Sequence, residues 1–431
     1  MIRKQGFKET GIERIPVEWN PNIFSDVVNV NPKRSLRKGT EAKYVSMADL
    51  KEFDKKIQTH LVKEFKGGSK FQNRDTLMAR ITPCLENGKT AFVDILNEDE
   101  VGFGSTEFIV LSGKDAKTTN EFVYYLSRLP KVRDTAIKSM VGTSGRQRVQ
   151  NDVFNRLIIA LPPITEQKAI AKILSDLDDK IELNRQMNAT LEQIGQAIFK
   201  HWFVDFEFPN EDGKPYRSSG GEMVDSEMGE VPEGWGVGTI GDIAENPRRG
   251  VKPSAILADT SYVGLEHMPR KSIALGKWGC VGDVTSGKFQ FQSGEIPFGK
   301  LRPYFHKVGI AAIDGVCSTD ILVIVPKHQS WFGFVLGHMS SDEVIQYTDT
   351  ISTGTKMPRA NWKDLAQYEI IVPIVNVVEA FNIKINLITE MIVSNIHQSR
   401  AIAAIRDALL PKLMSGELRV PDVDKLVEVI E

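Results

Sequence analysis

The sequence predicts an α+β fold made of two mixed α/β modules, each followed by a long helix, with the two helices packing as an antiparallel coiled coil. Three observations predict it: an internal two-fold repeat, a long heptad-like apolar pattern at the end of each copy, and short alternating strand and helix signals before it. Of the 431 residues, 41% are hydrophobic and 26% are charged, which is typical of a folded globular chain.

Short segments of the first half recur in the same order in the second half, at offsets of 213 to 220 residues. The matching segments are 15–19 with 231–235, 44–47 with 262–265, 79–83 with 299–303, and 105–110 with 318–323. Small differences among the offsets are expected where loops of different length join a shared scaffold. The sequence therefore predicts two copies of one structural unit.

A proline-containing stretch, at 161–164 and again at 372–374, ends each module and precedes a long helical pattern. Apolar residues follow at heptad-like spacing, and the two sets lie 211 residues apart. Each helix would run roughly 35 to 40 residues, or about 55 Å, and would need a partner to be stable. The predicted helix-pairing seam, which includes one asparagine per helix, consists of Ile170, Leu174, Leu177, Ile181, Asn184, Leu191 and Ile198 with Phe381, Ile385, Ile388, Ile392, Asn395, Ile402 and Leu409.

Alternating or apolar runs bounded by Gly, Pro, Asn and Asp predict strands inside the modules. We expect strands at 90–95, 108–111, 310–313 and 321–325, short helices at 121–129 and 332–339, and a polar linker at 209–234. Along the chain this gives a first module at 1–161, a first long helix at 162–208, a linker and second module at 209–372, and a second long helix with a tail at 373–431.

No segment approaches the roughly 18 to 20 apolar residues that cross a bilayer, and the first residues lead into charge rather than an apolar signal core. We therefore expect a cytoplasmic protein with no membrane contact. Cys84, Cys280 and Cys317 agree with a reducing compartment, because they are odd in number and widely spaced.

Several enzyme motifs nearly appear, and each fails on its context. The glycines at 236–241 satisfy G-x-G-x-x-G but follow a tryptophan turn instead of a strand, and the phosphate-loop spacing at 282–288 ends in Phe289 where a Ser or Thr is required. The only double proline, Pro162-Pro163, marks a helix entrance and not a methyltransferase tetrad. The seven histidines show no metal-ligand spacing. We predict no catalytic residue, no metal ligand and no cofactor in this chain.

Basic, glycine-punctuated loops occur at equivalent places in both copies, at 141–151 and 351–361. They combine hydroxyl, amide and cationic groups, which hold phosphates and read base edges. The formal net charge of −2 removes the simple argument for a nucleic-acid binder, and any single basic cluster is more often a solvated surface. The candidate DNA-binding residues are Arg34, Arg37, Lys38, Lys66, Lys70, Thr143, Ser144, Arg146, Gln147, Arg148 and Asn151 in the first copy, and Arg248, Arg249, Lys252, Thr353, Thr355, Lys356, Arg359 and Asn361 in the second.

The duplicated module and helix, with Leu-Pro-Pro-Ile-Thr-Glu-Gln-Lys at 161–168, the Pro-x-x-Trp segments ending at Trp19 and Trp235, and Leu-Leu-Pro-Lys-Leu-Met-Ser-Gly-Glu-Leu at 409–418, resemble the specificity subunit of a type I restriction-modification system. The resemblance covers essentially the whole chain. It implies two target-recognition domains, each reading one half of a bipartite, asymmetric sequence in double-stranded DNA, with the paired helices as a ruler between them.

The resemblance also implies partners in a prokaryotic cytoplasm. Two modification (methyltransferase) subunits would carry S-adenosylmethionine, and restriction subunits with translocase and nuclease activity would carry ATP and magnesium. Two other functions stay open: a coiled-coil scaffold whose modules bind proteins, and an enzyme with an unrecognised site.

Overall fold

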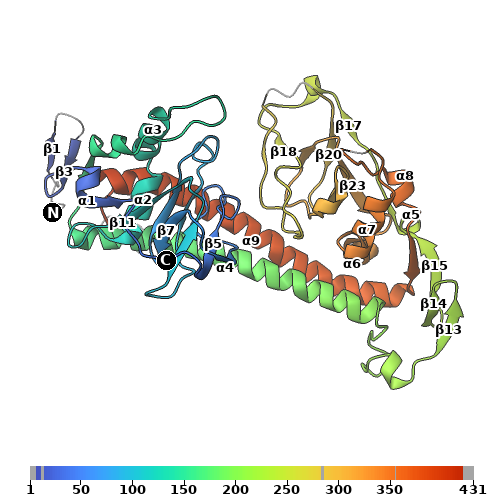
Figure 1. Ribbon diagram of the computed structural model, residues 1–431. Coiled ribbons are helices and arrows are strands. Elements are labelled where there is room, and N and C mark those ends of the chain that lie inside the picture. Colours follow the sequence, from blue (N-terminus) through green and yellow to red (C-terminus); the bar gives the residue numbers. More distant parts are fainter. Residues whose placement is uncertain (1–5, 11–13, 283–285, 355, 421–431) are drawn as a thin grey trace, which may run out of the picture. The chain divides into compact units, whose positions relative to one another are not determined.

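The computed structural model describes residues 6–10, 14–282, 286–354 and 356–420, and the chain divides into two compact units. Unit 1 comprises Met1–Glu182 with Ala401–Glu431, and unit 2 comprises Leu183–Arg400. Two long helices, α4 (Ile164–Phe203) and α9 (Val375–Ser415), contribute residues to both units (Figure 1). Their 40 and 41 residues confirm the long helices that the apolar spacing predicts.

Unit 1 contains a mixed α/β module. Its elements are β1 (Phe7–Glu9), β2 (Arg14–Pro16), β3 (Asn20–Ile23), α1 (Phe24–Val27), β4 (Val28–Val30), β5 (Glu41–Val45), β6 (Leu61–Glu64), β7 (Ser69–Gln72), β8 (Thr76–Ala79), β9 (Thr90–Phe92), β10 (Val101–Gly104), β11 (Phe108–Gly113), α2 (Asn120–Arg128), α3 (Pro130–Lys138), a 3₁₀ turn (Asn151–Asn155) and β12 (Ile158–Leu161). Two four-stranded sheets, β6-β5-β10-β7 and β4-β11-β8-β9, form its centre. Helix α2 packs on the second sheet, next to β8, β9 and β11.

Unit 2 repeats this architecture. Its elements are a 3₁₀ turn (Arg217–Ser219), β13 (Met223–Ser226), β14 (Gly229–Pro232), β15 (Gly236–Thr239), α5 (Ile240–Ile243), β16 (Ala244–Glu245), β17 (Gly250–Val251), a 3₁₀ turn (Pro253–Ala255), β18 (Ser261–Val263), β19 (Gly279–Cys280), β20 (Lys288–Phe291), β21 (Ile296–Gly299), a 3₁₀ turn (Pro303–Phe305), β22 (Gly315–Cys317), β23 (Ile321–Pro326), a 3₁₀ turn (Gln329–Trp331), α6 (Phe332–Met339), α7 (Asp342–Thr350), α8 (Trp362–Leu365) and β24 (Glu369–Val372). The parallel pairing of β5 with β10 recurs as β18 with β22, and the antiparallel pairing of β8 with β11 recurs as β21 with β23. The structure confirms the internal repeat.

Two expectations about the second module are wrong. No strand forms at 310–313: the Gly309 and Ala311 N–H groups donate to Pro297 and Glu295 of one segment, whereas the Ile310 N–H between them donates to Ile273 of another. The apolar run reflects burial and not a strand ladder. The stretch 209–234 is also more than a linker, since β13 and β14 pair as an antiparallel hairpin whose turn uses Gly229 at a φ of 98°.

The two long helices run antiparallel within each unit. In unit 2, the Asn184 Nδ2 donates to Ser399 Oγ over 3.1 Å and the Asn395 Nδ2 donates to Asn188 Oδ1 over 2.9 Å. These two contacts are equivalent under the 211-residue offset, so the helix pair has local two-fold symmetry here. Every residue of the predicted seam is buried or half-buried. The predicted segment boundaries at 162 and 373 lie close to the first residues of α4 and α9, and the four-segment division itself stays a prediction.

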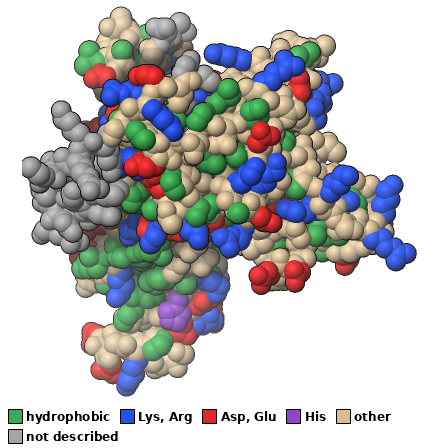
Figure 2. Space-filling model, turned by 90° about the vertical axis from the view of Figure 1, so that its left-hand side faces the viewer, with side chains coloured by type: hydrophobic (Ala, Val, Ile, Leu, Met, Phe, Trp, Pro, Cys, Tyr) green, Lys and Arg blue, Asp and Glu red, His purple; other side chains and the backbone are tan. Residues whose placement is uncertain are grey.

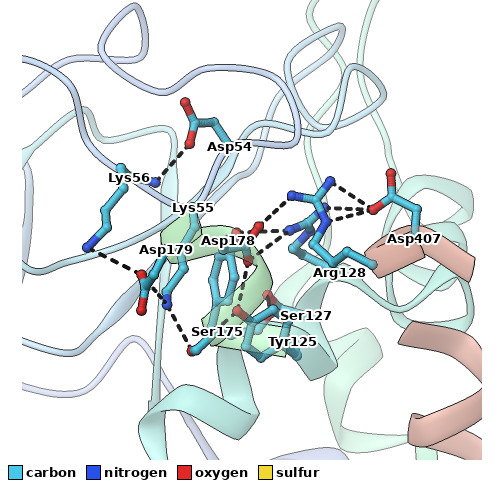
Figure 3. Close-up of polar contacts among 12 residues, drawn as sticks. Asp54, Lys55, Lys56, Tyr125, Ser127, Arg128, Ser175, Asp178, Asp179 and Asp407 are labelled. Atoms are coloured by element: carbon cyan, nitrogen blue, oxygen red, sulfur yellow. Dashed lines mark hydrogen bonds and ion pairs between the residues drawn. The ribbon is translucent and has the colours of Figure 1, made fainter. Parts of the chain in front are cut away.

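In unit 1, a buried ionic cluster joins the module to both helices (Figure 3). The Asp178 carboxylate of α4 accepts a hydrogen bond from Arg406 of α9, and it lies 3.8 Å from the Arg128 guanidinium at the end of α2. The Tyr125 hydroxyl donates to the same carboxylate over 2.7 Å. Burial and the Asp178 charge together raise the pKa of Tyr125. Burial alone would lower the pKa of Arg406, but the charges and hydrogen bonds of Asp178 and Asp407 together outweigh burial and raise the pKa.

Unit 2 joins its module to the helices with aromatic contacts instead. The positions equivalent to Asp178 and Arg406 hold Thr389 and Gly195. Gly337 of α6 leaves room for Phe199 of α4, since a Cβ at Gly337 would lie 2.2 Å from the Phe199 ring. Earlier in α4, Glu192 accepts hydrogen bonds from Ser272, Ile273 and Ala274 and holds that part of the module on the helix. Burial raises the pKa of Glu192, although these hydrogen bonds oppose the shift.

Candidate nucleic-acid interface

The first candidate loop is a hairpin that closes on Arg148. Its backbone pairs with Val141 across the hairpin and with Ile81, which follows β8. Between these ends, residues 142–146 are exposed, and the Arg146 N–H donates to the Thr143 carbonyl to form a turn. Thr143, Ser144 and Arg146 therefore project from a base that is fixed to the end of a buried strand.

The second candidate loop is built in the same way. Arg359 pairs through its backbone with Thr353 across the hairpin and with Leu301, which follows β21. Lys356 is exposed, and Thr355 lies outside the described residues. The sequence predicted that the two loops are equivalent, and the structure places them at equivalent positions of the two units.

A carboxylate binds the arginine at the base of each loop. The Arg148 Nε and Nη2 donate to Glu107 Oε1 over 2.9 and 2.7 Å, and the Arg359 Nε donates to Asp320 Oδ1 over 3.1 Å. The hydrogen bond to Glu107 raises the pKa of Arg148. In unit 2, burial lowers the pKa of Lys300, and the nearby charges of Arg248 and Arg359 lower it further. The Asp320 carboxylate opposes this shift, so cationic and anionic groups lie together at the base of the second loop.

The remaining candidates of unit 1 lie away from the loop, around β6 and β7. The Arg34 guanidinium forms an ion pair of 3.0 Å with Asp75, and the Lys70 ammonium donates to the Arg34 carbonyl. Lys66 pairs with Glu64 at the exposed end of β6. Arg37 and Lys38 are exposed on the segment that hydrogen-bonds to Phe65. The structure therefore brings these five candidates together, although two of them are paired with carboxylates.

The remaining candidates of unit 2 divide between the loop and the adjoining strands. Arg248 lies over the Phe289 ring at 5.8 Å, Arg249 forms a two-bond ion pair with Glu295, and Lys252 is exposed. Asn361 caps α8 by accepting the Asp364 N–H, which is a structural role.

The candidates at the edges of the first loop differ in their partners. Asn151 begins the 3₁₀ turn after the loop, and its buried Oδ1 has no hydrogen-bond partner among the described residues. Gln147 accepts a backbone hydrogen bond from Thr82 through its carbonyl. Gln147 is half-buried and follows the exposed Arg146 in the chain.

Sequence reasoning missed the groups that support the loops. Glu107 and Asp320 hold the two arginines, and Arg80 and Lys300 hydrogen-bond to the loops through their backbones. The signal was present, because these residues lie inside the repeated segments 79–83, 299–303, 105–110 and 318–323. Those segments identified the duplication but gave no reason to assign a contact to their polar residues.

Charge is mixed over the surface. On the face drawn in Figure 2, Lys and Arg side chains are interspersed with Asp and Glu, in line with the formal net charge of −2. Within the described ranges, no group of three or more His, Cys, Asp or Glu side chains could hold a metal ion. A search of the same residues finds no helix long and apolar enough to span a membrane.

Comparison with known proteins tests the resemblance drawn from the motifs. Residues 16–193 match the family model described as the type I restriction modification DNA specificity domain. The chain is 24% identical to the type I restriction enzyme MjaIX specificity subunit of Methanocaldococcus jannaschii over 97% of each chain, and 26% identical to the HindI specificity subunit of Haemophilus influenzae over 83% of this chain and 90% of that one.

A solved structure supports the fold. The type I restriction-modification S subunit from M. genitalium superposes with a TM-score of 0.52 at 13% identity, covering 92% of this chain and 96% of that one. The sequence comparisons confirm the resemblance drawn from the motifs: residues 16–193 match the DNA specificity domain, and the chain is similar over nearly its whole length to type I restriction enzyme specificity subunits.

Proposed function

We propose that this chain is the non-catalytic subunit that gives a type I restriction-modification enzyme its DNA sequence specificity, with each module reading one half of a bipartite, asymmetric target in double-stranded DNA. One observation carries the proposal: the same hairpin is held on the same base in both units, yet its exposed residues differ. Two loops with one support and two sequences suit the recognition of two unlike half-sites. The match to a DNA specificity domain supports DNA as the ligand.

The catalytic chemistry belongs to partners in this proposal. Two modification subunits would carry S-adenosylmethionine, and restriction subunits would carry ATP and magnesium. The mixed surface charge supports this division, because a chain with a net charge of −2 cannot by itself neutralise many phosphates. The partners would supply that charge and this chain would supply discrimination between sequences.

An exposed apolar stripe on α9 supports assembly through the long helices. Ile383, Leu387 and Met391 repeat every four residues, and their side chains are 64%, 59% and 48% exposed. The equivalent residues of α4 are all charged: Lys172, Asp176 and Lys180. Lys172 and Asp176 form an ion pair of 2.7 Å. Apolar side chains in a row on a solvent-facing helix are typical of an interface, and we assign this one to a modification subunit.

The test is methylation mapping of DNA from cells that express this chain with its modification subunit, compared with cells lacking only this chain. We expect a bipartite, asymmetric N6-methyladenine motif that disappears on deletion. Unchanged methylation with an active modification subunit would contradict the proposal.

Reversing the charge of the two loops, by Arg146→Glu and Lys356→Glu, distinguishes a DNA-specificity subunit from a protein-binding scaffold. A DNA-reading subunit would lose the motif while its assembly stays intact, whereas a scaffold would be unaffected.

A further inference from the structure

The base of the two loops is the same down to individual hydrogen bonds. In unit 1 the Val149 N–H donates to the Arg80 carbonyl over 2.9 Å, and the Thr82 N–H donates to the Gln147 carbonyl over 3.0 Å. In unit 2 the corresponding bonds join Ala360 to Lys300 over 3.0 Å and Arg302 to Pro358 over 2.8 Å. Backbone hydrogen bonds of this kind do not depend on side-chain identity, so they preserve the position of the hairpin when its sequence changes.

The arginine–carboxylate pairs complete this base. Arg80 and Lys300 each donate their N–H to the carbonyl of the carboxylate residue, Glu107 or Asp320, over 2.8 and 3.0 Å. The N–H of Glu107 donates to the Ser105 hydroxyl over 3.1 Å, and that of Asp320 donates to the Ser318 hydroxyl over 3.2 Å. The backbone of each carboxylate residue is therefore held by hydrogen bonds at both its N–H and its carbonyl. A guanidinium whose Nε donates to a carboxylate on this backbone is oriented, and in Arg148 the Nη2 donates as well.

The tips above this base have different chemistry. The first is Gly-Thr-Ser-Gly-Arg-Gln at 142–147 and the second is Gly-Thr-Lys-Met-Pro at 354–358. Both tips start at a glycine in a conformation that disfavours other residues, since φ is 139° at Gly142 and 106° at Gly354. After that shared turn the first tip offers a guanidinium and an amide, whereas the second offers an ammonium, a thioether and a proline.

We propose that the two tips determine the bases read in the two half-sites, and that Arg148–Glu107 and Arg359–Asp320 are positioning pairs that aim the tips at the DNA. The proposal rests on the proposed function, because it assumes that the modules bind DNA. Arg146 is exposed and has no ion pair among the described residues. Its planar guanidinium fits the O6 and N7 of a guanine in the major groove, and it is the base-reading group of the first tip. Lys356 is the corresponding cation of the second tip.

The experiment uses the full chain with its modification subunit and measures methylation at every genomic site, for Arg146→Ala and Lys356→Ala in parallel. Arg146→Ala should relax one base pair of one half-site by about tenfold or more and leave the other half-site and the spacer unchanged. Lys356→Ala should relax the other half-site, so each variant is the matched control for its counterpart.

A second pair of variants tests the positioning role. Glu107→Gln and Asp320→Asn should lower the extent of methylation at the wild-type motif without changing any preferred base, and Arg148→Lys should fall between wild type and Arg148→Ala. A purely structural role would lower the thermal stability and assembly of these variants in proportion to the lost methylation, so both are measured alongside. Proportional losses would overturn the positioning role.

The outcomes separate this inference from the proposed function. If the wild-type chain gives no bipartite motif with an active modification subunit, the proposed function fails. If the motif exists but Arg146→Ala changes both half-sites, or lowers methylation uniformly without relaxing a base, the tips do not read sequence and the inference fails alone.

Discussion

At the scale of single residues, the buried cluster around Asp178 is the site most sensitive to substitution. The Asp178 side chain is 4% exposed and lies between the guanidinium groups of Arg406 and Arg128, whose side chains are 6% and 5% exposed. Asp178→Leu removes the buried counter-charge that both cations share and leaves them only Asp407, whose side chain is 54% exposed. We expect the free energy of unfolding of unit 1 to fall by about 3–5 kcal/mol, measured by denaturant unfolding.

The matched control for this prediction is the exposed ion pair on the same helix. Lys172→Met breaks the ion pair with Asp176. The side chains of both residues face solvent. Exposed pairs contribute less than about 1 kcal/mol, so this variant should unfold close to the wild type. Equal losses of unfolding free energy in the two variants would show that the Asp178 cluster stabilises the fold no more than an exposed ion pair does.

His338 makes the stability of unit 2 dependent on pH. Its ring lies between Phe199 and Phe334, and burial lowers its pKa to about 3 from an ordinary value of 6.5. Between pH 6.5 and 3, His338 binds a proton in the unfolded chain but stays neutral in the folded chain. The free energy of unfolding therefore falls as the pH drops from 6.5 toward 3, by at most about 1.4 kcal/mol per pH unit.

The variant His338→Leu removes this dependence and keeps the site apolar. Thermal unfolding at pH 7 and pH 5 should show a smaller difference between the two midpoints in the variant than in the wild type. His201→Gln, at an exposed histidine of α4, should leave the difference unchanged. An identical pH dependence in wild type and His338→Leu would contradict the assignment.

At the scale of elements, the exposed stripe of α9 predicts where a partner binds. Leu387→Glu places a charge in the middle of the stripe and should weaken binding of the modification subunit by about tenfold or more, because a buried charge without a counter-ion is costly. Leu387→Met should retain binding. The measurement is titration of the purified chain with the modification subunit.

The control for the stripe introduces the same charge on the other helix. Gln193 is exposed on α4, and Gln193→Glu should bind as the wild type does. Equal weakening by Gln193→Glu and Leu387→Glu would indicate a general effect of charge and not a docking surface.

The elements that the sequence predicts best are those with a long period. Both long helices follow from spacing that repeats over many turns, and the helix at 332–339 agrees with α6. The expected strand at 310–313 failed because burial alone gives the same apolar run as a strand. The hairpin β13–β14 was missed because its polar, glycine-containing stretch reads as a loop, while its order depends on strand pairing and neighbouring aromatic contacts such as Phe208 on Trp235.

The candidate site was predictable only in part for a similar reason. The repeat located both loops, because two copies at one place in a scaffold are visible in sequence. The supporting carboxylates come from segments about 40 residues away in the chain, and only the folded sheet brings Glu107 to Arg148 and Asp320 to Arg359. Contacts across that separation leave no local pattern.

At the scale of the whole molecule, the proposed function and the paired helices together predict the spacing between the two half-sites. Because Asn184 pairs with Ser399 and Asn188 with Asn395, the stretch 183–189 lies opposite 394–400. Duplicating both stretches adds one heptad to each helix and keeps the seam in register. The added length is about 10 Å, and one base pair of DNA rises about 3.4 Å.

The duplicated chain should therefore methylate the same two half-sites with a spacer roughly three base pairs longer, because the loops and their supports are untouched. Methylation mapping with the modification subunit measures both quantities at once. Duplicating only 183–189 shifts one helix against the other and should abolish the motif, which makes it the matched control. A double duplication that changed the half-site bases while keeping the original spacer would contradict the ruler, since length and base identity would then depend on the same residues.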